Sequence, residues 1–375
     1  MNAASPRILI DLSVAPPGGA GTFATGFLGG LVEADLPDRD RRVVIVDAEW
    51  ARDRSELLSA VEQRGITVDA RRFAPPGTWS ARLGRGRALR ELAEHHEIDV
   101  AYFPRDVAPR LRQPTVIEAK NRYAWQVFAS SAPVGGPVSA WLLRRAARRS
   151  ARRAAAVLAV SGPMREAMGP EVEVTAIVHH GCALPEYDRS QVLDDPDGPF
   201  RVAMVGTVMA NKGIDVVIEG VALARRAGRP WELHVHGSRG DADYVAQLDR
   251  LALERLGTSV LRGPAYGPDL LEAYRHAHVV AVGSTFESFC FPLIEAMRSS
   301  CVVVAPDSAL VHELCGPVAV TYREGDPESL AAALEVAWNE RDERRSAGLE
   351  RSRRFTWAAT VEQTLREVRA VGTAA

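Results

Sequence analysis

Residues 7–33, RILIDLSVAPPGGAGTFATGFLGGLVE, decide how the chain is expected to fold. The aliphatic run at 7–12 predicts a buried strand, a Gly-rich turn follows at 16–21, and the sequence of 22–33 predicts a helix. Because a strand, a glycine turn and a helix in this order begin a parallel sheet covered by helices, the sequence predicts an α/β fold.

The alternation continues along the chain and restarts after residue 200. Further strands are predicted at 43–46, 100–103, 115–118, 156–160, 201–205, 232–236, 259–262, 279–282 and 302–305. Helices are predicted at 55–64, 87–96, 214–226, 242–256, 268–276 and 292–299. We therefore expect an N-terminal domain over 1–184, a linker rich in Pro, Asp and Gly at 185–199, a second domain over 200–354 and a C-terminal helix within 355–375.

Composition supports two ordinary globular domains and excludes several classes of protein. The chain has 375 residues, of which 46% are hydrophobic and 25% charged, with a formal net charge of −2. A dedicated nucleic-acid binder would need a basic surface, so no nucleic-acid partner is expected. The four cysteines lie far apart without metal-ligand spacing, and neither a signal peptide nor a long apolar run is present, so the sequence predicts a cytoplasmic location.

Lysine is almost absent from the chain. Of 46 basic residues only Lys120 and Lys212 are lysine, which leaves 44 arginines. A composition bias explains the arginines. The two exceptions could mark positions that need a compact, flexible ammonium group instead of a planar guanidinium.

The segment 285–295, TFESFCFPLIE, follows a predicted strand and begins a helix. Pro292 suits the first helical turn, and the N–H groups around 289–293 would then form a cradle for a diphosphate. Glu295, one turn inside, could accept hydrogen bonds from vicinal hydroxyls, and Glu287 lies nearer whatever extends beyond the phosphates. In isolation such a pair is explained as a helix-dipole acid and a solvated loop residue. Lys212, in the loop 206–213, favours the phosphate site because a cation there would face the same sheet edge.

The spacing of Glu287 and Glu295 resembles the E-x7-E signature of retaining glycosyltransferases of family GT4, which have the GT-B fold. Several further segments are similar to this family in order and spacing: GGAG at 18–21, AVSGPMRE, HHGC at 179–182, VGTVMANKG, the run RGPAYGPDLLEAYRHAHVVAVGS and FTWAATVEQTL. The resemblance implies two Rossmann-like domains that face each other across a cleft, with the C-terminal helix crossing back to the N-terminal domain. It also implies sugar transfer from a nucleotide diphosphate sugar, most readily UDP- or GDP-linked, with neither a metal nor a cofactor.

The resemblance also implies roles for individual residues. Glu295 would bind the donor ribose, Glu287 the hydroxyls of the donor sugar, and Lys212 the diphosphate. The other donor-binding positions would offer backbone groups, close approach to the ligand or a neutral hydrogen bond; they are Gly19, Gly21, Gly206, Thr207, Gly237, Pro264, Ala265, Ser288, Phe289, Cys290 and Leu293.

Three positions depart from the family pattern. Thr207 stands where many members have an arginine, and Cys290 replaces the glycine of the F-G dipeptide. Where the N-terminal domain often places a histidine near the reacting centre, this chain has Lys120 and Asn121. Asn121 could bind a sugar hydroxyl, and Lys120 could supply the charge lost at Thr207. The alternative for Lys120 is a surface residue at a strand end.

The segment 138–156 predicts a helix on which six arginines, between Arg144 and Arg153, share roughly half of the circumference while alanines occupy much of the rest. The ordinary explanation is a solvated face of a domain helix. A functional alternative is weak peripheral contact with anionic lipid.

The sequence therefore predicts a retaining glycosyltransferase with an unknown glycan, lipid-linked or small-molecule acceptor. Two alternatives stay open. One is a catalytically silent homologue that acts as a binding subunit, suggested by Thr207 and Cys290. The other is a nucleotide-sugar epimerase, which would need acid and base groups that the sequence does not identify.

Overall fold

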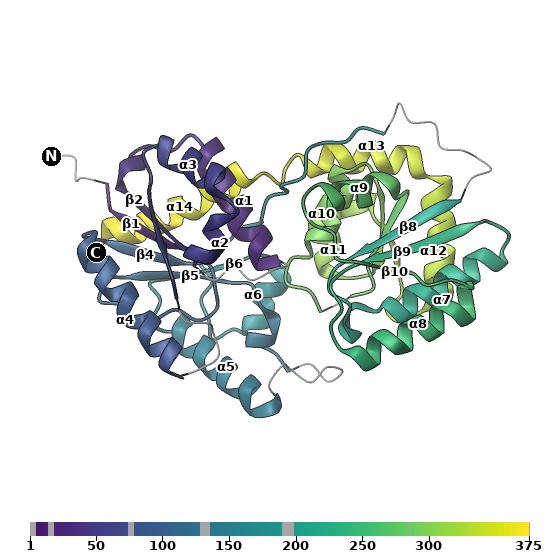
Figure 1. Ribbon diagram of the computed structural model, residues 1–375, viewed down its shortest axis with the longest axis horizontal. Helices are drawn as coiled ribbons and strands as arrows, with labels where there is room; N and C mark the ends of the chain where they lie inside the picture. The colour runs from purple at the N-terminus through teal and green to yellow at the C-terminus, as the bar shows by residue number, and fades with distance from the viewer. Residues whose placement is uncertain are drawn as a thin grey trace. The chain divides into compact units, whose positions relative to one another are not determined.

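The computed structural model describes residues 5–13, 19–73, 79–127, 136–189, 199–284 and 286–374, with only the backbone at 79–83. The chain forms two compact units, Met1–Gly181 with Phe355–Ala375, and Cys182–Arg354, and each is described by itself (Figure 1). Residues 190–198 of the expected linker, and Gly18 of the GGAG segment, lie outside the described residues.

The first unit contains a seven-stranded parallel sheet in the order β3-β2-β1-β4-β5-β6-β7. Its strands are β1 (Ile8–Asp11), β2 (Arg42–Asp47), β3 (Thr67–Arg71), β4 (Val100–Phe103), β5 (Thr115–Ala119), β6 (Ala156–Ala159) and β7 (Ala176–Ile177). The centre of the sheet is aliphatic on both faces because helices cover both sides, and β1 and β4 are buried throughout. The edge strand β3, which the sequence patterns did not predict, is largely exposed.

Within the described residues, seven α-helices surround this sheet. They are α1 (Gly19–Glu33), α2 (Ala48–Arg52), α3 (Ser55–Gln63), α4 (Trp79–His95), α5 (Gly136–Ala151), α6 (Gly162–Met168) and α14 (Trp357–Ala374), with the 3-10 turns η1 (Arg39–Arg41) and η2 (Arg122–Ala124). Helix α1 begins at Gly19, so the expectation that residues 19–21 form part of a turn is wrong. Glycine is compatible with a helix where tertiary packing supports it, and here α1 packs against α14.

The C-terminal helix α14 packs against α1 in the first unit, as the resemblance implied (Figure 1). The contact depends on glycines. A Cβ atom added at Gly30 would lie 2.4 Å from the carbonyl oxygen of Trp357, and one at Gly181 would lie 2.3 Å from the Trp357 backbone nitrogen. Glycine therefore permits the close approach by which residues 357–374 pack beside α1.

The second unit contains a six-stranded parallel sheet in the order β10-β9-β8-β11-β12-β13. Its strands are β8 (Phe200–Val205), β9 (Trp231–His236), β10 (Leu261–Gly263), β11 (Val279–Ala281), β12 (Val302–Pro306) and β13 (Val320–Tyr322). Its helices are α7 (Ile214–Arg226), α8 (Ala242–Leu256), α9 (Pro268–His276), α10 (Phe291–Arg298), α11 (Ala309–Cys315), α12 (Pro327–Asn339) and α13 (Arg341–Ser352), with η3 (Ala210–Lys212) and η4 (Gly316–Val318).

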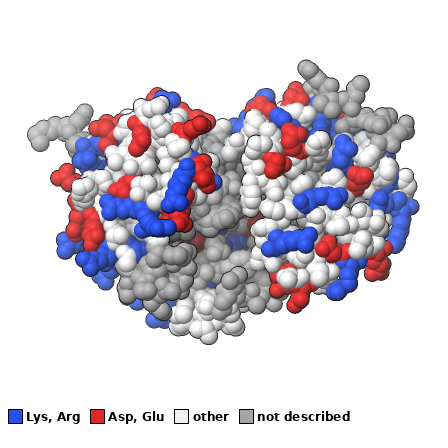
Figure 2. Space-filling model, in the orientation of Figure 1, with Lys and Arg blue, Asp and Glu red and all other residues white. Residues whose placement is uncertain are grey.

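Both sheets have the strand order of a doubly wound nucleotide-binding fold, in which the first and fourth strands lie side by side at the centre. In the second unit these strands are β8 and β11, and in the first they are β1 and β4. The chain leaves such a pair toward opposite sides of the sheet, which opens a crevice at their carboxyl ends. A ligand is therefore expected at the loops that follow these strands. Figure 2 shows acidic and basic side chains interspersed over the visible face of both units, so the charge that it displays marks no site by itself.

Candidate functional site

Four neighbouring strands of the second unit end at one edge of its sheet, and the predicted donor-binding residues of this unit follow them. Gly206, Thr207 and Lys212 come after β8, and Gly237 comes after β9. Pro264 and Ala265 follow β10, and residues 287–295 follow β11. Because the strands are parallel, the structure brings these positions to the same edge, at the crevice between β8 and β11.

Glycines let the loops at this edge pack backbone against backbone. A Cβ atom added at Gly237 would lie 1.8 Å from the carbonyl oxygen of Gly206, and one at Gly213 would lie 2.6 Å from that of Gly283. The N–H of Gly206 donates to the carbonyl of His236 at 2.9 Å. Gly213 has a φ of 60°, in the left-handed region that favours glycine. The first, second and fourth strand ends are therefore held together without intervening side chains.

Lys212 and Glu287 meet at this edge although 75 positions separate them. Lys212 ends η3, and its Nζ donates to Oε1 of Glu287 at 2.5 Å. Their side chains are 28% and 19% exposed, so both are held in place yet reachable from solvent. The pair thus presents a cation and an anion side by side at this edge of the sheet.

The turn into α10 is tighter than the sequence indicated. Cys290 has φ 61° and ψ 74°, a left-handed conformation that glycine adopts without strain, and this explains why the family has glycine at this position. Pro292 lies in the first turn, as predicted. The N–H of Leu293, expected to be free for a ligand, instead donates to the carbonyl of Cys290 at 3.1 Å, and its side chain is buried. The turn therefore uses the N–H of Leu293, and the donor-binding role of Leu293 stays a prediction.

Two neighbours of Cys290 in the same loop differ in exposure. Phe289 is buried, and its ring packs edge-on against that of Phe291 at a centroid distance of 5.4 Å. Ser288 is half-buried. The contact between the two rings joins the loop to the first residue of α10.

Glu295 lies inside α10 and is only 6% exposed. Its Oε2 accepts a hydrogen bond of 2.6 Å from the hydroxyl of Tyr274 in α9. Burial raises the pKa of Glu295 to about 7, although the Tyr274 hydroxyl opposes the shift. Sequence reasoning missed Tyr274. A buried carboxylate requires a partner, but nothing in the spacing of the sequence says which helix supplies it.

The predicted site residues of the first unit occupy different surroundings. Gly19 is exposed, and Gly21 half-buried, in the first turn of α1. Asn121 caps η2, where its side-chain oxygen accepts the N–H of Tyr123 at 3.1 Å.

Lys120, which follows β5, is half-buried, and its Nζ lies 3.3 Å from the ring centroid of Phe23. Burial lowers the pKa of Lys120 to about 8, against the opposing charges of Glu118 and Asp106. It is therefore more than the surface residue of the alternative explanation. Lys120 and Thr207 belong to different units, so the idea that one compensates for the other stays a prediction.

Sequence reasoning missed two buried carboxylates of the first unit, Asp11 and Glu118. Asp11, at the end of β1, forms ion pairs with Arg105 and Arg85. Burial opposes its ionisation, but the two guanidinium groups hold the pKa of Asp11 below its usual range. The carboxylate of Glu118 in β5 contacts Nε2 of His180 at 2.5 Å and accepts the hydroxyl of Tyr102. Each carboxylate is matched to partners far away in the sequence.

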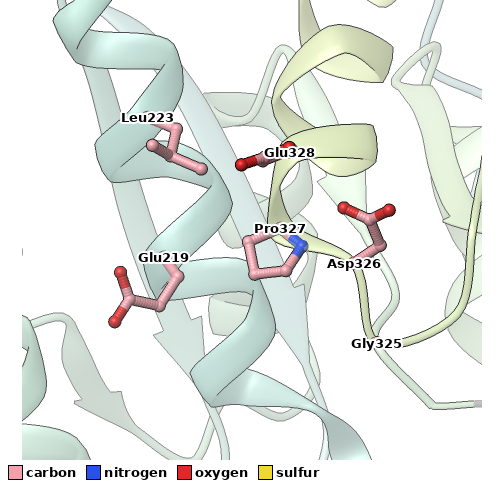
Figure 3. A pocket seen from close by; sticks show the side chains of 6 residues that line it. All are labelled: Glu219, Leu223, Gly325, Asp326, Pro327 and Glu328. Carbon is pink, nitrogen blue, oxygen red and sulfur yellow. The ribbon is translucent and has the colours of Figure 1, made fainter.

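A pocket between α7 and α12 shares no residue with this site (Figure 3). It is lined by Glu219, Leu223, Gly325, Asp326, Pro327 and Glu328. Two of its three carboxylates already have partners, because Glu219 binds Arg255 at 2.8 Å and Asp326 caps α12. An acidic lining repels phosphate, so this pocket is no alternative donor site. Within the described residues no cluster of three or more potential metal ligands occurs.

The chain is similar to known glycosyltransferases in part of its sequence. Residues 188–353 match the family model for glycosyl transferases group 1. A D-inositol 3-phosphate glycosyltransferase of Segniliparus rotundus is 30% identical over 177 residues, which cover 45% of this chain and 39% of that protein. The corresponding protein of Nocardia farcinica is 34% identical over 178 residues, covering 44% and 39%. The chain thus spans about two fifths of the length of these curated relatives.

Two solved structures cover nearly the whole chain. Sucrose-phosphate synthase of Thermosynechococcus elongatus has a TM-score of 0.74 at 15% identity and covers 98% of this chain and 99% of its own. Anabaena HepE, solved with UDP and glucose, has a TM-score of 0.68 at 20% identity and covers 97% and 100%. Residues 188–353 therefore match the family model for glycosyl transferases group 1, and the whole chain has the α/β fold of these two solved structures, GT-B.

Proposed function

We propose that the chain transfers a sugar from a nucleotide diphosphate sugar, UDP- or GDP-linked, to an acceptor with retention of anomeric configuration. The contact between Lys212 and Glu287 at the crevice beside α10 carries the proposal. A cation suited to phosphate and a carboxylate suited to sugar hydroxyls thus lie together at the edge where such folds bind nucleotides, which supports the proposal. HepE, a structural neighbour, has been solved with UDP-glucose, which supports this class of donor.

Each residue of the second unit has a distinct task in this proposal. Lys212 and the N-terminal end of α10 balance the charge that grows on the diphosphate as its bond to the anomeric carbon breaks. Glu287 holds the sugar hydroxyls, and Glu295 accepts hydrogen bonds from the ribose. The acceptor oxygen bonds to the anomeric carbon on the same face, and its proton passes to the departing phosphate oxygen. This balance requires neither a covalent enzyme intermediate nor a metal or a cofactor.

The decisive test combines donor binding with turnover of the purified chain. Calorimetry with UDP-, GDP- and ADP-glucose identifies the base, and D-inositol 3-phosphate is the first acceptor to try because the curated relatives are named for it. Lys212→Met or Glu287→Gln should lower turnover about 100-fold or more, since each removes charge stabilisation at the reacting centre. Glu362→Gln, on the exposed side of α14, is the matched control. Native turnover in either site variant refutes the assignment.

On the acceptor side, we propose that Lys120 supplies charge that Thr207 lacks and that Asn121 binds a sugar hydroxyl. The half-buried position and lowered pKa of Lys120 support a functional ammonium group, because burial without a role would cost stability. Lys120→Ala and Asn121→Ala should each lower turnover more than they lower thermal stability. Unchanged turnover and donor affinity in Lys120→Ala would disprove the compensation.

A catalytically silent homologue is the second candidate, and the neutral Thr207 favours it. Such a protein would bind the donor with normal affinity yet release no nucleotide with any acceptor or with water. An epimerase would instead convert the donor alone into a second nucleotide sugar, which chromatography after incubation without acceptor detects. We further propose a cytoplasmic location, where nucleotide sugars would be the available donors.

A further inference from the structure

Helix α5 exposes a surface that the proposed donor site does not use. Near its first turn, the large apolar side chains Val138, Trp141 and Leu142 are 70%, 54% and 41% exposed. Arg145 and Arg149 are exposed farther along the helix, and Arg152 and Arg153 are exposed just beyond its end. Figure 1 shows α5 at the periphery of its unit. The exposed surface thus changes from apolar to basic along the helix.

These two parts belong to one face. At about 100° per residue, Val138, Leu142, Arg145 and Arg149 lie within an arc of about 60°, and Trp141 borders it. The guanidinium of Arg145 lies over the Trp141 ring at 5.6 Å and joins the two parts.

The alanines of α5 explain why the sequence alone favoured an ordinary solvated helix face. In the sequence they formed the face opposite the arginines, which would insert poorly into lipid. In the structure Ala140, Ala147 and Ala151 are buried against the unit, so they are unavailable to any partner. The face that meets the outside carries tryptophan, valine and leucine instead. A solvated domain helix does not need three large apolar residues exposed on its first turns.

Charge around this helix is one-sided over a long stretch. No acidic residue occurs between Glu118 and Glu166, although the whole chain has a net charge of −2. The basic residues in that interval are Lys120, Arg122, Arg144, Arg145, Arg148, Arg149, Arg152, Arg153 and Arg165. Arg148 binds Glu171 at 3.3 Å, and Arg122 donates to Gln126 at 3.1 Å.

We propose that α5 docks the chain on an anionic lipid bilayer. Val138, Trp141 and Leu142 would enter the boundary between headgroups and acyl chains, where tryptophan is favoured, while Arg145, Arg149 and Arg152 bind lipid phosphates. The contact is peripheral: among the described residues, no helix is both long and apolar enough to cross a bilayer. The docking is independent of the proposed glycosyl transfer, because it depends on none of the donor-site residues.

The test is co-sedimentation of the full chain with vesicles of phosphatidylcholine alone or of phosphatidylcholine with phosphatidylglycerol. We expect binding only with the anionic lipid, and weaker binding as salt is added. Trp141→Gln with Leu142→Gln keeps the charge and should lower the partition coefficient at least tenfold. Arg145→Gln with Arg149→Gln and Arg152→Gln should lower it roughly fivefold per arginine.

The control variant removes the same number of exposed arginines elsewhere: Arg64→Gln, Arg226→Gln and Arg250→Gln. It should bind vesicles as the native chain does, and circular dichroism should show all variants folded. Equal binding to neutral vesicles, or an equal loss in the control, overturns the proposal. So does a result in which the Trp141 and Leu142 changes alter only self-association in sedimentation velocity, because that would identify a second copy as the occupant.

Discussion

The carboxyl edges of the two sheets share one strand order but handle charge in different ways. In the second unit the edge is built from glycines packed backbone to backbone, and Lys212 and Glu287 pair where solvent reaches them. In the first unit Asp11 and Glu118 are buried and paired with arginine, histidine and tyrosine. The first arrangement keeps polar groups available to a ligand, whereas the second commits them to the protein.

This contrast separates function from stability. A partly exposed pair adds little to folding, because water competes for both charges. A buried carboxylate with several partners adds little in net terms but is costly to break, because its partners then stay buried without it. Substitutions on the two edges should therefore fail in different assays.

The largest loss of stability should come from a substitution at the sheet edge of the first unit, where the carboxylates are buried. Glu118→Ala removes the carboxylate that contacts His180 and accepts the Tyr102 hydroxyl, so we expect a loss of about 3–5 kcal/mol in the free energy of unfolding. Glu287→Gln on the other edge should cost less than about 1 kcal/mol. Urea denaturation measures both. A small loss for Glu118→Ala together with a large one for Glu287→Gln would reverse the comparison.

The sequence predicted the α/β fold and the C-terminal helix well because their signals are local. Aliphatic runs mark the central strands, and the residues of the motif that follows β11 lie within one loop and one helix turn. The edge strand β3, with its mixed sequence Thr67–Arg71, and the short β13 (Val320–Tyr322) gave no comparable signal. Tertiary packing, more than local preference, made them strands.

The site was predictable to the extent that parallel strand order aligns loops. Lys212 and Glu287 follow the two central strands β8 and β11, so the family pattern sufficed to associate them. Tyr274, Asp11 and His180 escaped notice because their partners are chosen by packing between distant segments. The hydrogen bond of the Leu293 N–H was not predicted, for a different reason. This N–H is used by a turn whose left-handed residue, Cys290, does not have the type that marks such turns.

A second test inserts a single methyl group into the glycine-packed edge. In Gly237→Ala the new Cβ would lie 1.8 Å from the Gly206 carbonyl oxygen, so backbone must move, and we expect a loss of about 3 kcal/mol together with weaker donor binding. Gly29→Ala in α1 has no neighbour within 4 Å and is the control, expected to gain up to about 1 kcal/mol. Differential scanning calorimetry reads both. If Gly237→Ala melted at the same temperature as the native chain, the backbone at this edge would accommodate a Cβ atom at little cost.

A third test measures how stability depends on pH through Glu295, a buried carboxyl in the second unit. Its pKa is raised to about 7 in the folded chain, so folding binds a proton and stability falls as pH rises from about 4.5 to 7. Glu295→Gln removes that slope and should stabilise the chain at pH 8 by on the order of 2 kcal/mol. The same variant should bind donor less tightly. A native pH profile retained by Glu295→Gln would contradict the assignment.

The smallest effect concerns the left-handed residue at the start of α10. Cys290 has a φ of 61°, a conformation that costs a residue with a side chain about 1–2 kcal/mol, and Cys290→Gly relieves this strain. The same change increases the conformational entropy of the unfolded chain and removes a partly buried thiol, and both effects lower stability. Because these effects oppose each other, we expect the free energy of unfolding to change by less than about 1 kcal/mol in either direction. Cys290→Ala keeps the Cβ and the strain and should be the less stable of the two variants in urea. If Cys290→Ala were the more stable, backbone strain would not be the reason for glycine at this position of the family.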